Sequence, residues 1–190
     1  MKRREAQFDA LFQTYVSDVV AYCRWRASSP SDAEEAVAEV FLTAWRRFDD
    51  VPQGDAARVW LYATARRMIA NQRRSTRRRA ALAERVALTT PVHEPPADQV
   101  HSLVREGLRR LGPLDREVLL LSEWEGLSPA QIATVLRCCK VTARGRLHRA
   151  RRRFRSAYEE LLAGEATERL GRSASAAPTR PVSHALEGGS

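Results

Sequence analysis

Apolar side chains recur every three or four residues along the first part of the chain, a spacing that predicts amphipathic helices. One such stripe predicts a helix over residues 6–27, which a Ser-Ser-Pro sequence ends. Ser31 and Glu34 have the spacing of a capping box, so a second helix is predicted from there to about Phe48. The apolar face of that helix is expected to include Phe41 and Trp45.

A loop rich in turn-forming residues follows at 49–55. A third helix is predicted over about 56–85, which begins with aromatic residues and continues as a run of arginines. The three helices together are expected to form a first domain, residues 6–85. We predict an extended, proline-rich linker over residues 86–98, because prolines replace the apolar periodicity there.

A second domain is expected over residues 99–163. It opens with an apolar helix that Gly-Pro ends, and Asp115 is expected to cap the next helix, which would bury Val118 and Trp124. The chain after 163 has no apolar pattern, so residues 164–190 are expected to be disordered. No segment predicts a β-strand. The fold class is therefore all-α, with two small helical domains joined by the linker.

The second domain also contains a helix-turn-helix pattern. Ser128 and Gln131 form a capping box, and Pro129 takes the favoured first position of a helix over 129–136. A short turn at 137–139 leads into a further helix. Two helices joined by so short a turn, the second of them basic, are typical of a DNA-binding domain.

That second helix carries the chain's densest positive charge. Its apolar stripe is narrow, and between Cys139 and Phe154 there is no acidic residue. Helices exposed only to water usually mix their charges, so this helix indicates a negatively charged partner. The residues expected to contact DNA are Lys140, Thr142, Arg144, Gly145, Arg146, His148 and Arg149. Gly145 either lets the backbone approach DNA or is a tolerated surface glycine, and the sequence leaves both open.

The composition of the chain supports a polyanionic partner and argues against a membrane as that partner. The 190 residues carry a net charge of +9, which suits nucleic acid better than a membrane, because the basic helices have thin apolar faces. No apolar run is long enough to span a bilayer and no signal peptide opens the chain, so we expect a cytoplasmic protein without a membrane contact.

Two further clusters have competing interpretations. In the third helix, Trp60 and Tyr62 precede a run of arginines; these residues could stack on an opened DNA strand, although aromatics at this spacing are more often core. Asp32, Glu35 and Glu39 lie on one side of the second helix, where they form either a solvated face or a docking surface for a basic protein partner.

Catalysis and metal binding are not expected. Cys138 and Cys139 are adjacent, which suits neither an ordinary disulfide nor a zinc site that includes His148. The carboxylates of the second helix lack the Glu-x-x-His motif of helical metal sites. No phosphate loop or nucleophile elbow is present. We therefore expect a protein without a catalytic activity, a cofactor, a metal or a small-molecule substrate.

Two pairs of segments together resemble a known family. The first is DAEEAVAEVFLTAWRRF (32–48) with WLYATARRMIANQRR (60–74). The second is LRRLGPLDREVLLLSEWEGLSPAQIATVL (108–136) with TARGRLHRARRRF (142–154). In this order, with a linker between them, they resemble bacterial RNA polymerase sigma factors of the extracytoplasmic-function (ECF) group. The resemblance covers about residues 6–163.

The resemblance implies a function and a set of roles. The protein would bind core RNA polymerase and direct it to promoter DNA, and an anti-sigma protein is a further partner that the group allows. The first domain would be sigma region 2 and the second sigma region 4. Core-binding residues would be Asp32, Glu35, Glu39, Phe41 and Trp45. The −10 element would be read and melted by Trp60, Tyr62, Arg66, Arg67, Asn71, Arg73 and Arg74, and the helix-turn-helix would read the −35 element.

The chain departs from the family pattern at the turn, where Arg137 stands in place of the usual glycine. A residue with positive φ is easy for glycine and costs more for arginine. Asn71 stands where aspartate is common, which could alter −10 preference. The main alternative function is a stand-alone helix-turn-helix regulator, which would bind DNA without polymerase and would leave residues 32–48 without a role.

Overall fold

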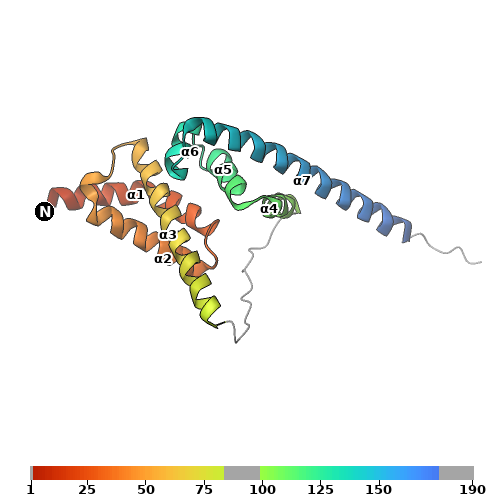
Figure 1. Cartoon of the computed structure of the whole chain (residues 1–190), viewed down its shortest axis with the longest axis horizontal. Helices are drawn as coiled ribbons and strands as arrows, with labels where there is room; N and C mark the ends of the chain where they lie inside the picture. Colours follow the sequence, from red (N-terminus) through yellow and green to blue (C-terminus); the bar gives the residue numbers. More distant parts are fainter. Residues whose placement is uncertain (1, 84–98, 176–190) are drawn as a thin grey trace, which may run out of the picture.

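The computed structural model describes residues 2–83 and 99–175, and within these two ranges every regular element is a helix. The elements form two groups, which we call the N-terminal domain (α1 to α3) and the C-terminal domain (α4 to α7) (Figure 1). The expected all-α, two-domain fold is confirmed. The predicted linker over 86–98 lies outside the described residues, as does the final part of the predicted tail.

The N-terminal domain consists of three packed helices. They are α1 (Lys2–Arg24), α2 (Pro30–Arg46) and α3 (Asp55–Ala83), with a short 3-10 helix, η1 (Phe48–Asp50), in the loop before α3. Alanines on α2 let the helices approach closely, and Tyr22 of α1 stacks on Tyr62 of α3 with ring centroids 4.9 Å apart. The fully or nearly fully buried residues of this core include Val19, Tyr22, Cys23, Ala33, Ala36, Val40, Ala44, Leu61, Tyr62 and Ala65.

The C-terminal domain builds its core from the other four helices. They are α4 (Gln99–Arg110), α5 (Pro113–Glu123), α6 (Pro129–Leu136) and α7 (Lys140–Ser175). The predicted capping box at Ser128 is present, since Gln131 N–H donates to Ser128 Oγ and Ser128 N–H donates to Gln131 Oε1. The buried side chains that hold these helices together include Val118, Leu121, Ile132, Val135, Ala143, Leu147 and Ala150.

Two predicted helix starts were wrong, for one physical reason. The N-cap of α2 is Ser29, whose Oγ accepts a hydrogen bond from Asp32 N–H at 3.1 Å, so Ser31 lies inside the helix. The N-cap of α5 is Gly112, and Asp115 lies in the first turn. In both cases a proline occupies the first helical position, and its fixed φ favours the start of a helix there. The helices therefore begin before Ser31 and Asp115, the residues from which the caps were predicted.

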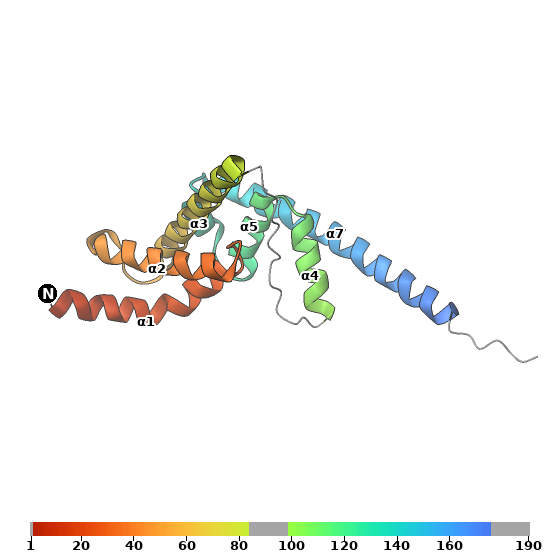
Figure 2. The ribbon, with the colours of Figure 1, turned by 90° about the horizontal axis from the view of Figure 1, so that it is seen from below.

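The prediction of disorder from residue 164 was wrong for residues 164–175, because α7 continues to Ser175. Extending an existing helix adds one hydrogen bond per ordered residue and needs no new nucleus, so the leucine, alanine and glutamate residues after Phe154 suffice. The distal half of α7 extends away from the other helices (Figure 2). None of the helices in the described ranges is long and apolar enough to cross a membrane.

Candidate nucleic-acid interface

The turn before α7 contains a residue with positive φ, a backbone conformation that costs arginine more than glycine. Arg137 adopts φ 52° and ψ 50°, in the left-handed region, and is the single non-glycine residue with positive φ among those described. The backbone N–H of Cys138 then donates to Ala133 O at 3.0 Å, which closes the end of α6. Arg137 thus adopts the conformation that is easy for glycine at this turn, and the turn still brings α7 against α6 as a helix-turn-helix requires.

The arginines of α7 fall into two classes. Arg151 pairs with Glu123 at 2.7 Å, and Arg153 pairs with Asp115, so these two guanidinium groups are occupied within the domain. In contrast, no carboxylate of the described residues forms an ion pair with Arg144 or Arg149. The unpaired positive charge therefore gathers at the start of α7, on the segment that the helix-turn-helix presents outward.

The predicted DNA-contacting residues of α7 are only partly exposed. Exposed members are Lys140, Arg144, His148 and Arg149, while Thr142, Gly145 and Arg146 are half-buried. Thr142 Oγ1 lies 3.0 Å from Sγ of Cys139, the residue that precedes the helix. Hydrogen bonds from the side chain and the backbone of Thr142 lower the pKa of the Cys139 thiol below its usual value.

The seven predicted −10 residues of α3 point in different directions. Arg67, Asn71, Arg73 and Arg74 are exposed, and Asn71 Oδ1 accepts a hydrogen bond from Arg74. Tyr62 is buried, and its hydroxyl donates to Glu125 Oε2 of the C-terminal domain at 3.0 Å. Burial, with the nearby Glu125 carboxylate, raises the pKa of Tyr62. The structure thus places Tyr62 in the core, as aromatics at this spacing often are, and Trp60 and Arg66 are half-buried.

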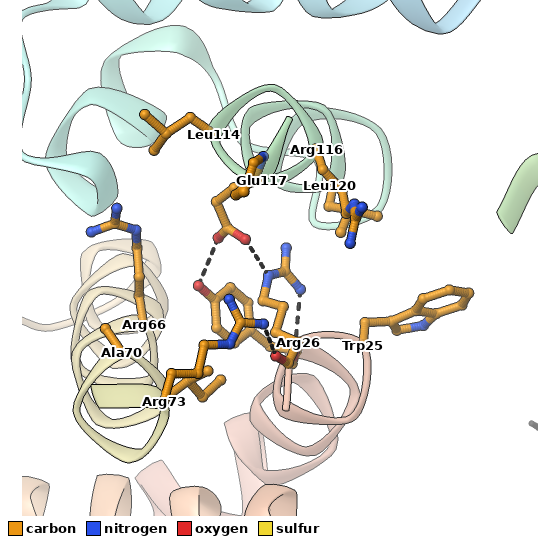
Figure 3. A pocket seen from close by; sticks show the side chains of 12 residues that line it. Trp25, Arg26, Arg66, Ala70, Arg73, Leu114, Arg116, Glu117 and Leu120 are labelled. Carbon is orange, nitrogen blue, oxygen red and sulfur yellow. Dashed lines mark hydrogen bonds and ion pairs between the residues drawn. The ribbon is translucent and has the colours of Figure 1, made fainter. Parts of the chain in front are cut away.

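An ion-pair network that the sequence analysis missed joins the two domains (Figure 3). Arg26, just after α1, donates from Nε to Glu117 Oε2 at 2.8 Å and from Nη1 to Glu125 Oε1 at 3.0 Å. Tyr22 hydroxyl donates to the other oxygen of Glu117 at 2.8 Å. The side chain of Arg26 is 6% exposed. Burial acts to lower the pKa of Arg26, but Glu117, Tyr22 and Glu125 together outweigh it and raise that pKa.

A sequence signal for Arg26 did exist. Val19, Tyr22 and Cys23 form the buried stripe of α1, and Arg26 continues that stripe by three to four residues. A charged residue on an apolar stripe needs a buried partner. That partner could not be found from periodicity, because Glu117 and Glu125 lie more than ninety positions further along the chain.

Aromatic side chains of α1 and α2 form a second surface. Phe8 meets Trp45 edge-on with ring centroids 5.1 Å apart, and Phe12 meets Phe41 at 4.7 Å. Phe41 is 6% exposed and belongs to the core, whereas Trp45, expected to point inward, is 37% exposed. The structure adds Phe12 and Leu42, each 39% exposed, to this surface.

The three predicted acidic residues of α2 lie in different environments. Glu35 accepts a hydrogen bond from Gln72 Nε2 at 3.2 Å, and the same amide donates to the backbone carbonyl of Asp32 at 3.1 Å. Glu39 is exposed. Within the described residues no group of three histidine, cysteine, aspartate or glutamate side chains could hold a metal ion.

Comparison with known proteins decides the family. Residues 11–79 match the family model for Sigma-70 region 2, and residues 101–154 match that for Sigma-70, region 4. The chain is 33% identical to the ECF RNA polymerase sigma factor SigL of Mycobacterium tuberculosis over 160 residues, which is 80% of this chain and 89% of that one. This chain belongs to the ECF sigma factors of the sigma-70 family. It therefore directs initiation of transcription.

Other comparisons agree with that assignment. The sigma factor is 30% identical over 136 residues to the ECF RNA polymerase sigma factor BldN of Streptomyces coelicolor, across 68% of this chain and 52% of the relative. Its fold resembles that of RpoE in complex with the anti-sigma factor NepR from Bartonella quintana. The TM-score is 0.69 and the identity 21%, over 80% of this chain and 97% of the other. CnrH in complex with the cytosolic domain of CnrY gives a TM-score of 0.59 at 21% identity, over 82% and 90%.

Proposed function

We propose that this sigma factor reads the −35 element with the start of α7, reads the −10 element with α3, and docks on core RNA polymerase through α2. The observation that carries the proposal is the unpaired positive charge of Arg144 and Arg149 on the second helix of a helix-turn-helix. Guanidinium groups that no carboxylate neutralises are available to phosphates and guanine edges in a major groove.

The −10 assignment is narrower than the sequence suggested. Arg67, Asn71 and Arg74 form an exposed polar group on α3 and are the residues we assign to the −10 element. In the arrangement of this structure, which we call closed, Arg66 and Arg73 line the cavity between the two domains, so we assign them to DNA only after the domains separate. The buried Tyr62 and the half-buried Trp60 then act by setting the position of the helix. A few kcal/mol per base step are needed to unstack DNA, and exposed polar groups that capture bases can supply them.

The polymerase-docking surface is proposed to centre on Trp45 and Glu39. Trp45 combines with the exposed Phe12 and Leu42 into an apolar patch beside an exposed carboxylate. An aromatic anchor next to charged groups is typical of protein interfaces. Asp32 and Glu35 contribute negative charge, whereas Phe41 holds the patch from beneath through its contact with Phe12.

The remaining parts of the proposal follow from the family. We assign no catalytic activity to this chain, and we place its action in the cytoplasm, where it meets polymerase. RpoE has been solved with the anti-sigma factor NepR and CnrH with the cytosolic domain of CnrY, and we propose that an anti-sigma protein also restrains this chain. The functional units are residues 6–85 for the −10 element and polymerase, 86–98 for the linker, and 99–163 for the −35 element.

Reconstitution with core polymerase tests the proposal. The purified chain should co-elute with core enzyme and start transcription at a cognate promoter, which sequencing of transcript 5′ ends after overexpression would identify. Glu39→Ala with Trp45→Ala should abolish co-elution but leave the helical circular dichroism unchanged. If the chain protects an operator from nuclease without polymerase and never binds core enzyme, the alternative of a stand-alone regulator is correct.

A further inference from the structure

A cavity of about 390 Å³ lies between the two domains, with walls from α1, α3 and α5 (Figure 3). Four arginines line it, three from the N-terminal domain and one from the C-terminal domain, together with a single carboxylate, Glu117. The arginines are Arg26, Arg66, Arg73 and Arg116. Cavities of this size hold small molecules.

The positive charge of this cavity is not balanced by the protein. Glu117 and Glu125 neutralise the charge of Arg26. Arg73, in contrast, donates to a neutral acceptor, the backbone carbonyl of Arg26. Arg116 donates to the carbonyls of Leu108 at 2.7 Å and Arg109 at 2.9 Å. No carboxylate in the part of the chain that the structure describes pairs with Arg66, Arg73 or Arg116.

The electrostatic environment of Arg116 reflects this excess. Burial lowers the pKa of its guanidinium, and the nearby positive charges of Arg73 and Arg109 lower it further. Like charges held together at an interface repel each other, and the repulsion grows where water is partly excluded. An anion placed among these groups would relieve that repulsion.

A second observation points to a ligand inside the cavity. Nη2 of Arg26 is buried and has no hydrogen-bond partner, although Nε and Nη1 of the same group are fully engaged. A buried N–H group without an acceptor costs about 1–3 kcal/mol. Arg26 is 7% exposed and belongs to the cavity wall, so a ligand that draws its guanidinium group toward the cavity would give Nη2 an acceptor.

We propose that this inter-domain cavity binds a small phosphate-bearing anion with at least two phosphate groups. Guanidinium forks match phosphate oxygens, and unneutralised arginines from both domains call for a multivalent ligand. Trp25, 45% exposed, and Leu114, 44% exposed, give the same cavity an apolar edge against which a nucleoside could pack. The shared chemistry is the diphosphate group, which comes either from inorganic pyrophosphate or from a nucleotide.

The ligand would connect the two domains and so regulate this sigma factor. A ligand that binds only the closed arrangement stabilises it by mass action. This consequence rests on the proposed function, since Arg66 and Arg73 are assigned to −10 DNA only when the domains are apart. The diphosphate ligand and the promoter therefore compete for the same arginines.

Titration calorimetry on the full-length chain tests the site, with pyrophosphate as the probe and ionic strength held constant by sodium chloride. We expect saturable binding of one pyrophosphate per chain. Arg66→Gln and Arg116→Gln should each weaken it about tenfold, the value of one charge-assisted hydrogen bond. Arg152→Gln removes the same charge from an exposed position on α7 and serves as the matched control, with no change in affinity expected.

Each outcome of the titration is decisive. Heat no larger than that of dilution overturns the proposal. An equal loss of affinity in all three variants also overturns it, because binding would then depend on the net positive charge of the protein and not on this cavity. Arg66 forms no hydrogen bond within the described residues, so Arg66→Gln keeps the test valid even if Arg116→Gln unfolds the end of α4. Tighter binding of GTP or ATP than of pyrophosphate identifies a nucleotide as the source, whereas equal binding identifies the diphosphate alone.

This test uses neither polymerase nor promoter, so its failure differs from failure of the proposed function. A chain that starts transcription at a promoter but ignores pyrophosphate would overturn the ligand site alone. A chain that binds pyrophosphate but not core enzyme would overturn the proposed function and leave the site in place.

Discussion

Nε of Arg26 donates to Oε2 of Glu117 across 2.8 Å, and this contact ties the end of α1 to α5. The side chains of the pair are 6% and 14% exposed, so neither charge is well hydrated while the domains are together. Removing one partner of a buried pair typically costs about 3–5 kcal/mol, because the other charge stays buried without compensation. The pair therefore links the electrostatics of one domain to the position of the other.

We predict that Arg26→Gln separates the domains without unfolding them. Glu117 and Glu125 can return to water if the domains move apart, which is cheaper than remaining buried and unpaired. The radius of gyration from small-angle X-ray scattering should increase while helical circular dichroism is retained. Arg47→Gln is the control, since Arg47 and Asp50 form an exposed pair, typically worth about 0–1 kcal/mol. An unchanged radius for Arg26→Gln would show that apolar contacts such as Trp25 with Trp124 hold the domains together on their own.

The two classes of arginine on α7 lead to a second prediction. Arg144→Ala and Arg149→Ala should each weaken promoter binding by reconstituted holoenzyme by roughly 1–3 kcal/mol if they contact base edges. Arg151→Ala should have a smaller effect, because Arg151 is already paired with Glu123. Fluorescence anisotropy with a labelled −35 duplex measures all three. A loss for Arg151→Ala equal to that for Arg144→Ala would contradict this division.

Gly145 allows the fold and the DNA contact to be tested separately. A Cβ added at this position would lie 3.5 Å from Arg149 Nη1, an ordinary contact with the end of a flexible side chain. Gly145→Ala should therefore stabilise α7 by up to about 1 kcal/mol in thermal unfolding. It should also weaken −35 binding if the bare backbone approaches DNA. Gly164→Ala, in open space further along the same helix, is the control and should stabilise the protein without altering DNA binding.

Local features of the chain were largely predictable from the sequence. The helices follow from apolar stripes, and the capping box at Ser128 follows from its spacing, because both depend on residues a few positions apart. The starts of α2 and α5 were placed too late, since a proline outweighed the polar pattern after it. Helix α7 was predicted too short, because continuing a helix requires no signal stronger than good helix formers.

Contacts between distant segments were not predictable in the same way. Trp124 was expected in the core, but it is 51% exposed. Its ring packs on that of Trp25 of the other domain, with the ring centroids 6.0 Å apart. Tyr62 was assigned to DNA, and its partner Glu125 lies 63 positions away. No periodicity within one helix records such a partner. The sequence therefore predicted most residues of the apolar faces, with Trp45 and Trp124 as exceptions, but not which faces would meet.

The strained turn residue provides a fourth prediction. Arg137 has φ 52°, and a left-handed conformation costs a non-glycine residue about 1–2 kcal/mol. Arg137→Gly removes that cost but loses about 0.5–1 kcal/mol through the greater freedom of glycine in the unfolded chain. The net effect should be a small gain in the free energy of unfolding, measured with urea. Arg137→Ala keeps the strain and should give no gain; a gain as large as that for glycine would indicate that the arginine side chain, and not its backbone, is unfavourable.

The cysteines should differ sharply in reactivity. Cys139 is exposed and its pKa is lowered by hydrogen bonds from Thr142, so more of it is thiolate near neutral pH. Cys23 is buried, and burial raises its pKa to about 11. Iodoacetamide should therefore modify Cys139 first in the folded protein, with a rate that rises with pH and levels off below the ordinary thiol pKa. Cys23 should react only after unfolding.

Mass spectrometry of tryptic peptides over time distinguishes the sites. Thr142→Val removes the hydroxyl that hydrogen-bonds to Cys139 and should move the half-maximal rate to higher pH, without changing the protection of Cys23. Because Cys139 precedes the helix assigned to the −35 element, modification at this residue should also reduce promoter binding, and Cys139→Ser should make binding insensitive to the reagent. Rapid labelling of Cys23 in the folded chain would contradict the packing of α1 against α2 and α3.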